Sequence, residues 1–387
     1  MPVREKFLVF GAPDVQHAEI DEVVASLKSG WWGTGPKVMQ FERDFAEYKG
    51  VDETQVAAVN SCTAALHVSL IAAGIGPGDE VISTPMTFCA TINSIIHCGA
   101  IPVLADIDPV TMNIDPVHIE AKITDKTKAI SLVHFAGRPS DMEAILAIAE
   151  KHSLIVIEDC AHAIETEYYG QKAGTIGDFG CFSFYVTKNV ATGEGGMIIS
   201  KDEGVVARSK ILALHGMTKD AWRRYGDEGH VHYLVVESGF KYNMMDIQGA
   251  LGIHQLARVE KNWLRRQEIW QRYQEAFADL PVGVPAPPET NTRHGYHLFT
   301  LQIDESKAGI SRDRFLDGMI KNNVGVGVHY LSIPEHPFYQ ERFGWRLEDT
   351  PHAVQVGRQT VSLPFSPALS DGDVEDVITA VTKIIKK

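Results

Sequence analysis

The stretch from Gly177 to Asn189 reads Gly-Asp-Phe-Gly-Cys-Phe-Ser-Phe-Tyr-Val-Thr-Lys-Asn. Its aromatic and β-branched residues predict a strand, and Lys188 follows just beyond that strand. The run Thr192 to Gly196 is rich in glycine, which lets a backbone approach another group closely. Most lysines are solvated surface residues, but an apolar strand followed by a glycine turn is a poor setting for a purely solubilising charge. We therefore expect Lys188 to have a chemical role.

A carboxylate, Asp159, ends the apolar run Ile155 to Ile157. A buried carboxylate is costly unless a cation or a set of donors pairs with it. An amine, a carboxylate and a group of phosphate-binding hydroxyls or amides are what pyridoxal phosphate needs for its aldehyde, its ring nitrogen and its phosphate. We expect Lys188 to form a Schiff base with this cofactor and Asp159 to pair with its pyridine nitrogen. A helix N-cap is the alternative role of Asp159.

Three other segments could contact the same cofactor. Asn60 to Leu66 joins an expected strand to a helix, whose N-terminus would hold a phosphate, although Ser61 or Thr63 could simply cap the helix. Phe88 follows another expected strand and could stack on the pyridine ring or belong to the core. His162 could contact the phenolic oxygen of the cofactor or be a helix-start histidine with a backbone partner.

The composition is that of a globular enzyme, with 44% hydrophobic and 22% charged residues in a chain of 387. The net charge of -14 argues against a nucleic acid or an anionic membrane as partner, because both are bound through clustered Lys and Arg. A small anionic substrate needs only a local basic pocket. We see no signal peptide and no run of roughly 18 apolar residues.

The five cysteines are odd in number and lack the spacing of metal ligands. They are interpreted as reduced core residues, and we expect neither a disulfide framework nor a metal site. A cytoplasmic location follows from this interpretation.

Short apolar runs alternate with helical patterns through the first 200 residues, which predicts an α/β domain with a parallel sheet covered on both faces. From Asp246 to about residue 279 the pattern predicts one long helix, whose apolar stripe indicates a spine between domains rather than a cofactor lining. The remaining chain predicts an α+β domain with strands at Tyr296 to Ile303 and Val324 to Tyr330, and helices at Arg312 to Asn322 and Asp371 to Ile385. We assign residues 1–250 to a large cofactor-binding domain and residues 251–387 to the linking helix and a small C-terminal domain.

These motifs resemble those of the sugar aminotransferases of the DegT/StrS group, over nearly the whole chain. The resemblance rests on the following stretches: Gly30 to Pro36, Asn60 to Leu66, Gly76 to Val81, Glu158 to Ala163, Phe182 to Gly196, Phe240 to Asn243 and Ser362 to Pro364. It implies the fold type I architecture of aspartate aminotransferase, with a mainly parallel seven-stranded sheet in the large domain.

The resemblance also implies roles for individual residues. Lys188 would hold the cofactor and shuttle the proton, and Asp159 would bind the pyridine nitrogen. The other cofactor-binding residues would be Thr63, Ala64 and Ser183 at the phosphate, Phe88 and His162 at the ring, and Asn243 from a neighbouring subunit. The substrate-binding residues would be Thr34, Trp222, Lys241, His329 and Tyr330. A site shared in this way implies a homodimer.

Within the group, the chain is most similar to the UDP-4-amino-4-deoxy-L-arabinose aminotransferases, in Lys241 to Asn243, Val133 to Gly137 and Val328 to Tyr330. This similarity implies transfer of the amino group of L-glutamate to the C4 ketone of a nucleotide-linked 4-ketosugar, with release of 2-oxoglutarate. A C3 aminotransferase or a related pyridoxal phosphate-dependent sugar-modifying enzyme is one alternative, although the dehydratases of the group have histidine at position 188. A non-catalytic regulatory protein that binds the cofactor is the other.

Overall fold

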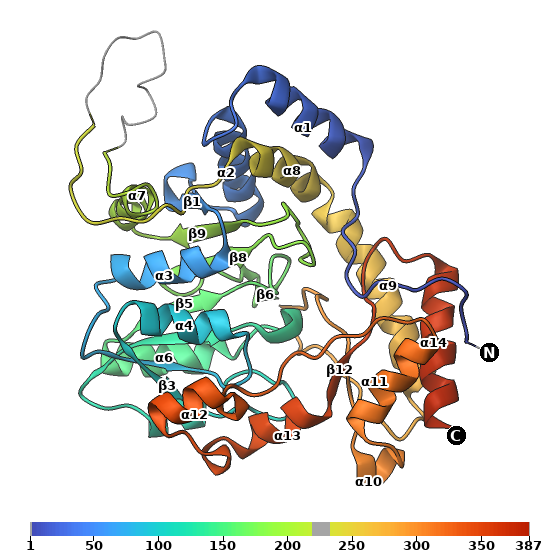
Figure 1. Cartoon of the computed structure of the whole chain (residues 1–387). Helices are drawn as coiled ribbons and strands as arrows, with labels where there is room; N and C mark the ends of the chain where they lie inside the picture. Colours follow the sequence, from blue (N-terminus) through green and yellow to red (C-terminus); the bar gives the residue numbers. More distant parts are fainter. Residues whose placement is uncertain (1, 219–232, 387) are drawn as a thin grey trace.

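The computed structural model describes residues 2–218 and 233–386 and shows a large α/β unit beside a smaller C-terminal unit (Figure 1). The large unit is built on a seven-stranded sheet in which β9 alone runs antiparallel to its neighbours. In spatial order its strands are β1 (Val56–Val59), β9 (Gly196–Ser200), β8 (Phe179–Ser183), β5 (Ile155–Asp159), β4 (Thr127–Val133), β2 (Glu80–Ser83) and β3 (Ile101–Leu104). The predicted mainly parallel seven-stranded sheet is confirmed.

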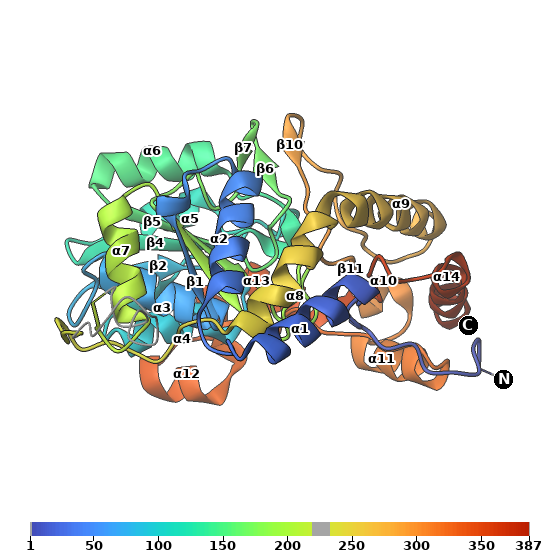
Figure 2. The same ribbon diagram turned by 90° about the horizontal axis from the view of Figure 1, so that it is seen from above.

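Helices cover both faces of this sheet, and Figure 2 shows α3 and α4 on one side and α6 on the other. The helices around the sheet are α2 (Pro36–Lys49), α3 (Cys62–Ala72), α4 (Cys89–His97), α5 (Pro116–Ala121), α6 (Met142–His152) and α7 (Glu203–Leu212). Because side chains alternate along a strand, Ile157 packs in the core beneath α3 whereas Val156 packs beneath α6. Asp159 therefore points to the α3 face and Glu158 to the α6 face.

The prediction of one long helix from Asp246 is wrong in one respect, because two helices meet at Arg258. They are α8 (Asp246–Ala257) and α9 (Val259–Phe277). Arg258 has φ -113° and ψ 11°, outside the helical region, and its guanidinium binds the carbonyl oxygen of Asp14 and the carboxylate of Glu19. The predicted apolar stripe is a core element, with Trp270 and Tyr273 buried against the C-terminal unit.

The C-terminal unit contains a short antiparallel pair, β11 (Thr300–Gln302) and β12 (Thr360–Ser362), packed with α11 (Arg312–Lys321) and α14 (Asp371–Ile385). The predicted strand at Val324 to Tyr330 is wrong. That segment forms single bridges, Leu8 to Val324 and Gly327 to Ser362, since it borders the N-terminal segment at one point and β12 at another. Glycines at 325 and 327 also weaken a strand.

The remaining helices and strands are short or lie at the edges of the two units. They are α1 (His17–Ser29), α10 (Glu305–Ala308), α12 (Pro337–Phe343), α13 (Pro351–Gln359), β6 (Glu167–Tyr168), β7 (Gln171–Lys172), β10 (Thr292–Arg293) and the 3-10 turns Glu53–Gln55, Phe135–Gly137, Ile333–Glu335 and Leu347–Asp349. The predicted domain boundary at residue 250 falls inside α8, and Arg4 of the N-terminal segment pairs with Asp373 of α14.

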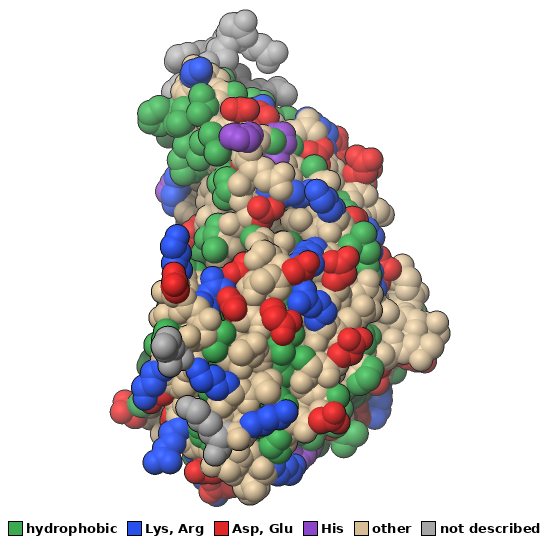
Figure 3. All heavy atoms as spheres, turned by 90° about the vertical axis from the view of Figure 1, so that its right-hand side faces the viewer, with side chains coloured by type: hydrophobic (Ala, Val, Ile, Leu, Met, Phe, Trp, Pro, Cys, Tyr) green, Lys and Arg blue, Asp and Glu red, His purple; other side chains and the backbone are tan. Residues whose placement is uncertain are grey.

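Seen from the right-hand side of Figure 1, acidic and basic side chains are interspersed over the surface, and hydrophobic side chains gather at the upper left (Figure 3). All five cysteines are free thiols. None of the helices described is long and apolar enough to cross a membrane.

Candidate active site

A cavity of 600 Å³ opens where the strands of the large sheet end. Parallel strands bring their carboxyl ends to one edge of a sheet, where ligands of open α/β folds bind. Residues far apart in the sequence therefore meet here. Eight of the predicted site residues line the cavity: Thr63, Phe88, Asp159, His162, Ser183, Lys188, His329 and Tyr330.

Asp159 is 5% exposed and ends β5 at the cavity. It accepts hydrogen bonds from the Ala161 N–H at 3.0 Å and the Thr91 hydroxyl at 2.8 Å. Burial raises the pKa of the Asp159 carboxyl, and these two donors only partly oppose that shift. Among the described residues it forms no ion pair, so a cationic ligand group would complete its environment. A protonated pyridine nitrogen fits this requirement.

Lys188 lies in the turn after β8 and lines the same cavity. Burial lowers the pKa of its amine to about 8, although the nearby Asp159 carboxylate acts in the opposite direction. Within the described part of the chain its Nζ has no hydrogen-bond partner. A buried amine with this pKa is partly unprotonated near neutral pH, as a nucleophile or base must be.

The N-terminus of α3 forms one wall of the cavity through Thr63, and Ser183 faces it from β8. Ser61 caps this helix, because its hydroxyl accepts the Ala64 N–H at 3.1 Å. Ala64 itself is 2% exposed, and its predicted phosphate contact would share the N–H that Ser61 already binds. A side chain at Gly196 would meet the carbonyl of Ser61 at 2.5 Å, so glycine is required for β9 to pass this close to the helix start.

Aromatic and imidazole rings form the opposite wall. Phe88 is 59% exposed and its ring centroid lies 6.1 Å from that of Tyr330. The Tyr330 hydroxyl is 3.1 Å from Nε2 of His162, whose Nδ1 accepts the Ala136 N–H at 3.3 Å. His329 lies next to Tyr330, and its Nδ1 is 2.8 Å from the Ser362 hydroxyl. Burial, with Lys188 nearby, lowers the pKa of His329 to about 4.

Three of the predicted site residues lie outside the Lys188 cavity. Thr34 and Asn243 line a separate cavity of 330 Å³ and are joined by a hydrogen bond of 2.7 Å from Asn243 Nδ2. Lys241 donates to the amide oxygen of Asn243. A single chain does not bring these residues to the Lys188 cavity. The predicted substrate contact Trp222 lies outside the described residues.

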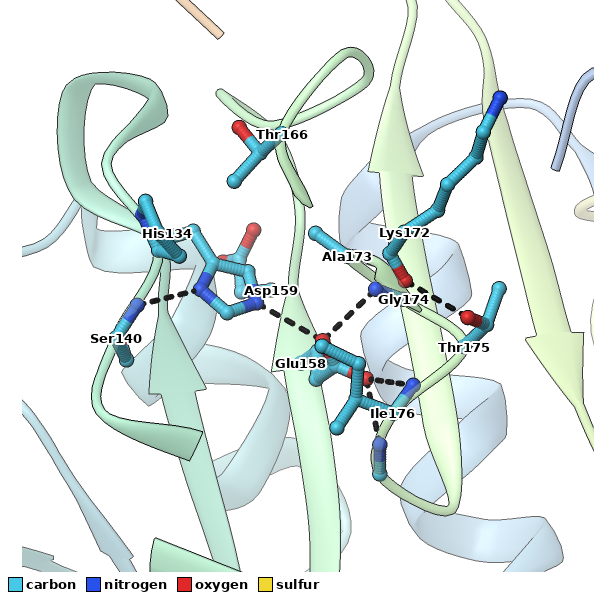
Figure 4. A network of polar contacts seen from close by, with 12 residues as sticks. His134, Ser140, Glu158, Asp159, Thr166, Lys172, Ala173, Gly174, Thr175 and Ile176 are labelled. Carbon is cyan, nitrogen blue, oxygen red and sulfur yellow. Dashed lines mark hydrogen bonds and ion pairs between the residues drawn. The ribbon is translucent and has the colours of Figure 1, made fainter. Parts of the chain in front are cut away.

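A buried carboxylate, Glu158, holds together the segments that carry the site (Figure 4). Its two oxygens accept the N–H groups of Gly174, Ile176 and Gly177 at 2.7–2.9 Å and face His134 Nε2 at 2.9 Å. Burial raises the pKa of the Glu158 carboxyl, but these donors outweigh burial and hold that pKa below its usual value. We call Glu158 with these four donors the Glu158 hub. It joins β4, β5 and the loop that leads into β8.

His134, Glu158 and Cys160 place their potential metal ligands within 4.8 Å of one another. Glu158 already accepts four hydrogen bonds, and Nδ1 of His134 accepts the Ser140 N–H at 3.0 Å. We therefore assign a structural role to this group.

Sequence reasoning missed several residues of the site. Thr91 supports Asp159 and lies one helical turn after Phe88, so a position on the same face of α4 could have indicated it. Asn189 and His297 lie behind the cavity wall and join through a hydrogen bond of 2.9 Å. No local pattern connects two residues so far apart in the chain.

Comparison with known proteins places the chain among aminotransferases. Residues 13–382 match the DegT/DnrJ/EryC1/StrS aminotransferase family. The chain is 49% identical over 384 residues to the spore coat polysaccharide biosynthesis protein SpsC of Bacillus subtilis (strain 168), covering 99% of this chain and 98% of that protein.

Two solved structures show the same fold. The putative sugar aminotransferase Spr1654 from Streptococcus pneumoniae, in its PLP form, superposes with a TM-score of 0.91 at 32% identity, covering 98% of this chain and 99% of the other. PseC of Helicobacter pylori, an aminotransferase involved in the biosynthesis of pseudoaminic acid, gives a TM-score of 0.90 at 27% identity, covering 98% and 100%.

The Glu158 hub predicts a large loss of stability on a nearly isosteric change. Glu158→Gln would turn an amide N–H₂ toward groups that only donate, so we expect the free energy of unfolding to fall by about 3 kcal/mol. Chemical denaturation of the cofactor-free protein measures this. The exposed Glu150→Gln on α6 is the control, with a change below about 0.5 kcal/mol. Equal effects of the two substitutions would contradict the hub.

The lowered pKa of Lys188 predicts its reactivity in the cofactor-free protein. Because only the unprotonated amine reacts, labelling of Lys188 by trinitrobenzenesulfonate should rise with pH through a midpoint near 8 rather than 10.5. Removal of the Asp159 charge in Asp159→Asn should move that midpoint lower, since the carboxylate stabilises the ammonium form. Peptide mass spectrometry reads the labelled fraction, and an identical midpoint in both proteins would contradict the coupling.

Proposed function

The chain belongs to the DegT/DnrJ/EryC1/StrS aminotransferase family and is a pyridoxal phosphate-dependent transaminase, and from this premise we propose that it aminates a nucleotide-linked ketosugar. The amino group of L-glutamate would move to the C4 ketone of a nucleotide-linked 4-ketosugar, with release of 2-oxoglutarate. The observation that carries the proposal is the presence of a buried, unpaired carboxylate and a buried amine in one cavity.

When bound, the cofactor supplies an electron sink that stabilises negative charge at the carbon whose proton is removed. In our proposal Asp159 keeps the ring nitrogen protonated, because its charge is buried and otherwise unpaired. Lys188 removes the proton from the α-carbon of the donor and later returns a proton to the sugar carbon, which a pKa of about 8 allows.

Other residues would bind and orient. The N-terminus of α3, with Thr63 and Ser183, provides hydroxyls and backbone dipoles for the phosphate. Phe88 and His162 would contact the ring, and His162 bonds Tyr330, which lines the substrate side with His329. Ala64 remains a proposed contact through its N–H.

The sugar substrate is supported by relatives. SpsC is named for polysaccharide biosynthesis, and Spr1654 is titled a putative sugar aminotransferase. The C4 position rests on the similarity of Lys241 to Asn243, Val133 to Gly137 and Val328 to Tyr330 to C4-aminating enzymes. Of these segments, Val328 to Tyr330 and the first residue of Val133 to Gly137 line the cavity beside Lys188. Five free thiols support the proposed location in the cytoplasm.

We infer a homodimer from what one chain lacks. The described residues around the Lys188 cavity include no arginine, although a phosphate and a nucleotide diphosphate need cations. The family resemblance assigns Asn243 to phosphate binding and Lys241 to substrate binding, but Asn243 lines another cavity and Lys241 donates to it there. Apolar side chains on and after α1 are exposed in a single chain, and they are Ile20, Val24, Leu27, Trp31 and Trp32. In our proposal a second copy covers them and supplies Asn243, with Lys241 beside it.

The proposed reaction predicts a regiochemical outcome. Incubation with L-glutamate and pyridoxal phosphate should convert a UDP-linked 4-ketosugar to the 4-amino sugar, but not the 3-ketosugar, as read by mass spectrometry and NMR. Lys188→Ala should reduce the rate roughly a thousandfold because the proton carrier is lost. Lys128→Ala, an exposed lysine on β4, is the control. Product from the 3-ketosugar alone would contradict C4 transfer, and cofactor binding without any product would favour a regulatory role.

The shared site predicts complementation between inactive subunits. Lys188→Ala lacks the base, and Asn243→Ala should bind pyridoxal phosphate more weakly because its phosphate contact is lost. At a cofactor concentration that saturates only the wild type, a refolded mixture of the two should regain roughly a quarter of wild-type activity, since half the dimers hold one intact site. A mixture no more active than its components would contradict a shared site. Homodimers of each variant are the controls.

A further inference from the structure

Asn189, directly after Lys188, is fixed by three hydrogen bonds. Its Nδ2 donates to Glu165 Oε2 at 2.8 Å and to the Gly295 carbonyl at 3.0 Å, and its Oδ1 faces His297 Nδ1 at 2.9 Å. A carboxylate and a carbonyl can only accept, so the amide nitrogen must face them. The amide oxygen therefore accepts from His297, which carries its proton on Nδ1.

His297 lies flat against a second imidazole. The ring centroids of His297 and His162 are 4.3 Å apart, with an angle of 28° between the rings. Nδ1 of His162 accepts the Ala136 N–H at 3.3 Å, so the proton of a neutral His162 is on Nε2. Nε2 lies 3.1 Å from the Tyr330 hydroxyl oxygen. The Tyr330 oxygen thus accepts this bond, and its own proton is left to donate into the cavity.

Asn189, His297, His162 and Tyr330 thus form a continuous array of contacts. A buried ion pair anchors the Asn189 end of this array. Glu165, which holds Asn189, also binds the Arg266 guanidinium of α9, and the two side chains are 0% and 2% exposed. His297 belongs to the segment that leads into β11. Its N–H donates to the Ala136 carbonyl at 3.0 Å, beside the same Ala136 N–H that binds His162. The array therefore joins the Lys188 turn to the C-terminal unit.

The surroundings of the two rings favour the neutral forms. Burial lowers the pKa of both His162 and His297 well below the usual value. Lys188 and His329 lower the pKa of both rings, His297 also lowers that of His162, and Arg266 and His294 also lower that of His297. Glu165 reaches His297 only through the Asn189 amide. The tautomers fixed by hydrogen bonding should therefore persist across neutral pH.

We propose that Asn189 and His297 are positioning residues for the transamination: they hold His162 in one orientation and tautomer, so that Tyr330 donates its hydroxyl proton into the cavity beside Lys188. This role rests on the proposed function, but the arrangement of protons does not. Neither residue lines the cavity, so they act through Lys188, His162 and Tyr330.

The protons can be observed without cofactor or substrate. In the cofactor-free dimer labelled with ¹⁵N-histidine, downfield proton NMR should show slowly exchanging N–H signals from Nδ1 of His297 and Nε2 of His162. Neither should titrate between about pH 6 and 8. His297→Phe keeps a ring against His162 and should remove one signal and shift the other. A His297 proton on Nε2, or a titration in this range, would overturn the proposal.

His294→Phe is the matched control. His294 is a buried histidine three residues away, whose Nδ1 accepts the Tyr296 N–H at 2.8 Å and which stacks on Tyr296 rather than on His162. It should leave both signals in place. If His297→Phe fails to fold, Asn189→Ala tests the same bond, and it should shift or broaden the His297 signal through faster exchange. Identical spectra in Asn189→Ala and the wild type would overturn the assignment.

The catalytic consequence is measured in the holoenzyme with L-glutamate alone. His297→Phe should slow the single-turnover half-reaction about tenfold while the pyridoxal phosphate dissociation constant changes less than about threefold. The effect should be lost in a Tyr330→Phe background, because His297 acts through that hydroxyl. Additive effects, or an equal loss in His294→Phe, would overturn the positioning role. A wild type that does not react with glutamate would refute the proposed function, and the NMR result would still stand.

Discussion

Two adjacent carboxylates, buried at the end of one central strand, impose the constraint on which the site depends. Glu158 and Asp159 point to opposite faces of the sheet, and burying either charge is costly without donors. The protein satisfies them unequally. Glu158 accepts three backbone N–H groups and His134, whereas Asp159 accepts the Ala161 N–H, the Thr91 hydroxyl and, at 3.9 Å, the weakly donating Cys62 thiol. The first carboxylate thus stabilises the scaffold, and the second is left for a ligand.

Because Glu158 is fully hydrogen-bonded, the segments that carry Lys188 are fixed while its amine is not. The Glu158 hub ties β4 and β5 to the loop before β8, and β8 leads directly to Lys188. Asn189 then fixes the turn from the other side through Glu165 and His297. The amine of Lys188 has no hydrogen-bond partner among the described residues, so no existing bond must break when it binds a ligand. Fixed surroundings and one amine without a hydrogen bond suit the proton transfers that we propose for Lys188.

Much of the cavity could be predicted because parallel strands end at a common edge. Thr63, Phe88, Asp159, His162 and Lys188 each lie at or just beyond the end of a β-prone run, which made them candidates for this cavity. The resemblance to a family added the phosphate role of Ser183, and His329 and Tyr330. Thr34, Lys241 and Asn243 lie away from this cavity in one chain, and for Lys241 and Asn243 we propose that a second subunit brings them to it.

The sequence by itself determined the alternation of strands and helices, the parallel sheet and the lysine and aspartate at its edge, since these depend on local periodicity and on where a charge follows a strand. Only the tertiary structure decided the break at Arg258, the loss of a strand at residues 324–330, and the association of Asn189 with His297. These features depend on partners that are distant in the sequence, such as Glu19 for Arg258, Leu8 for Val324 and His297 for Asn189. Hydrogen bonds between distant segments leave no period in the sequence, so the fold must form before they can be recognised.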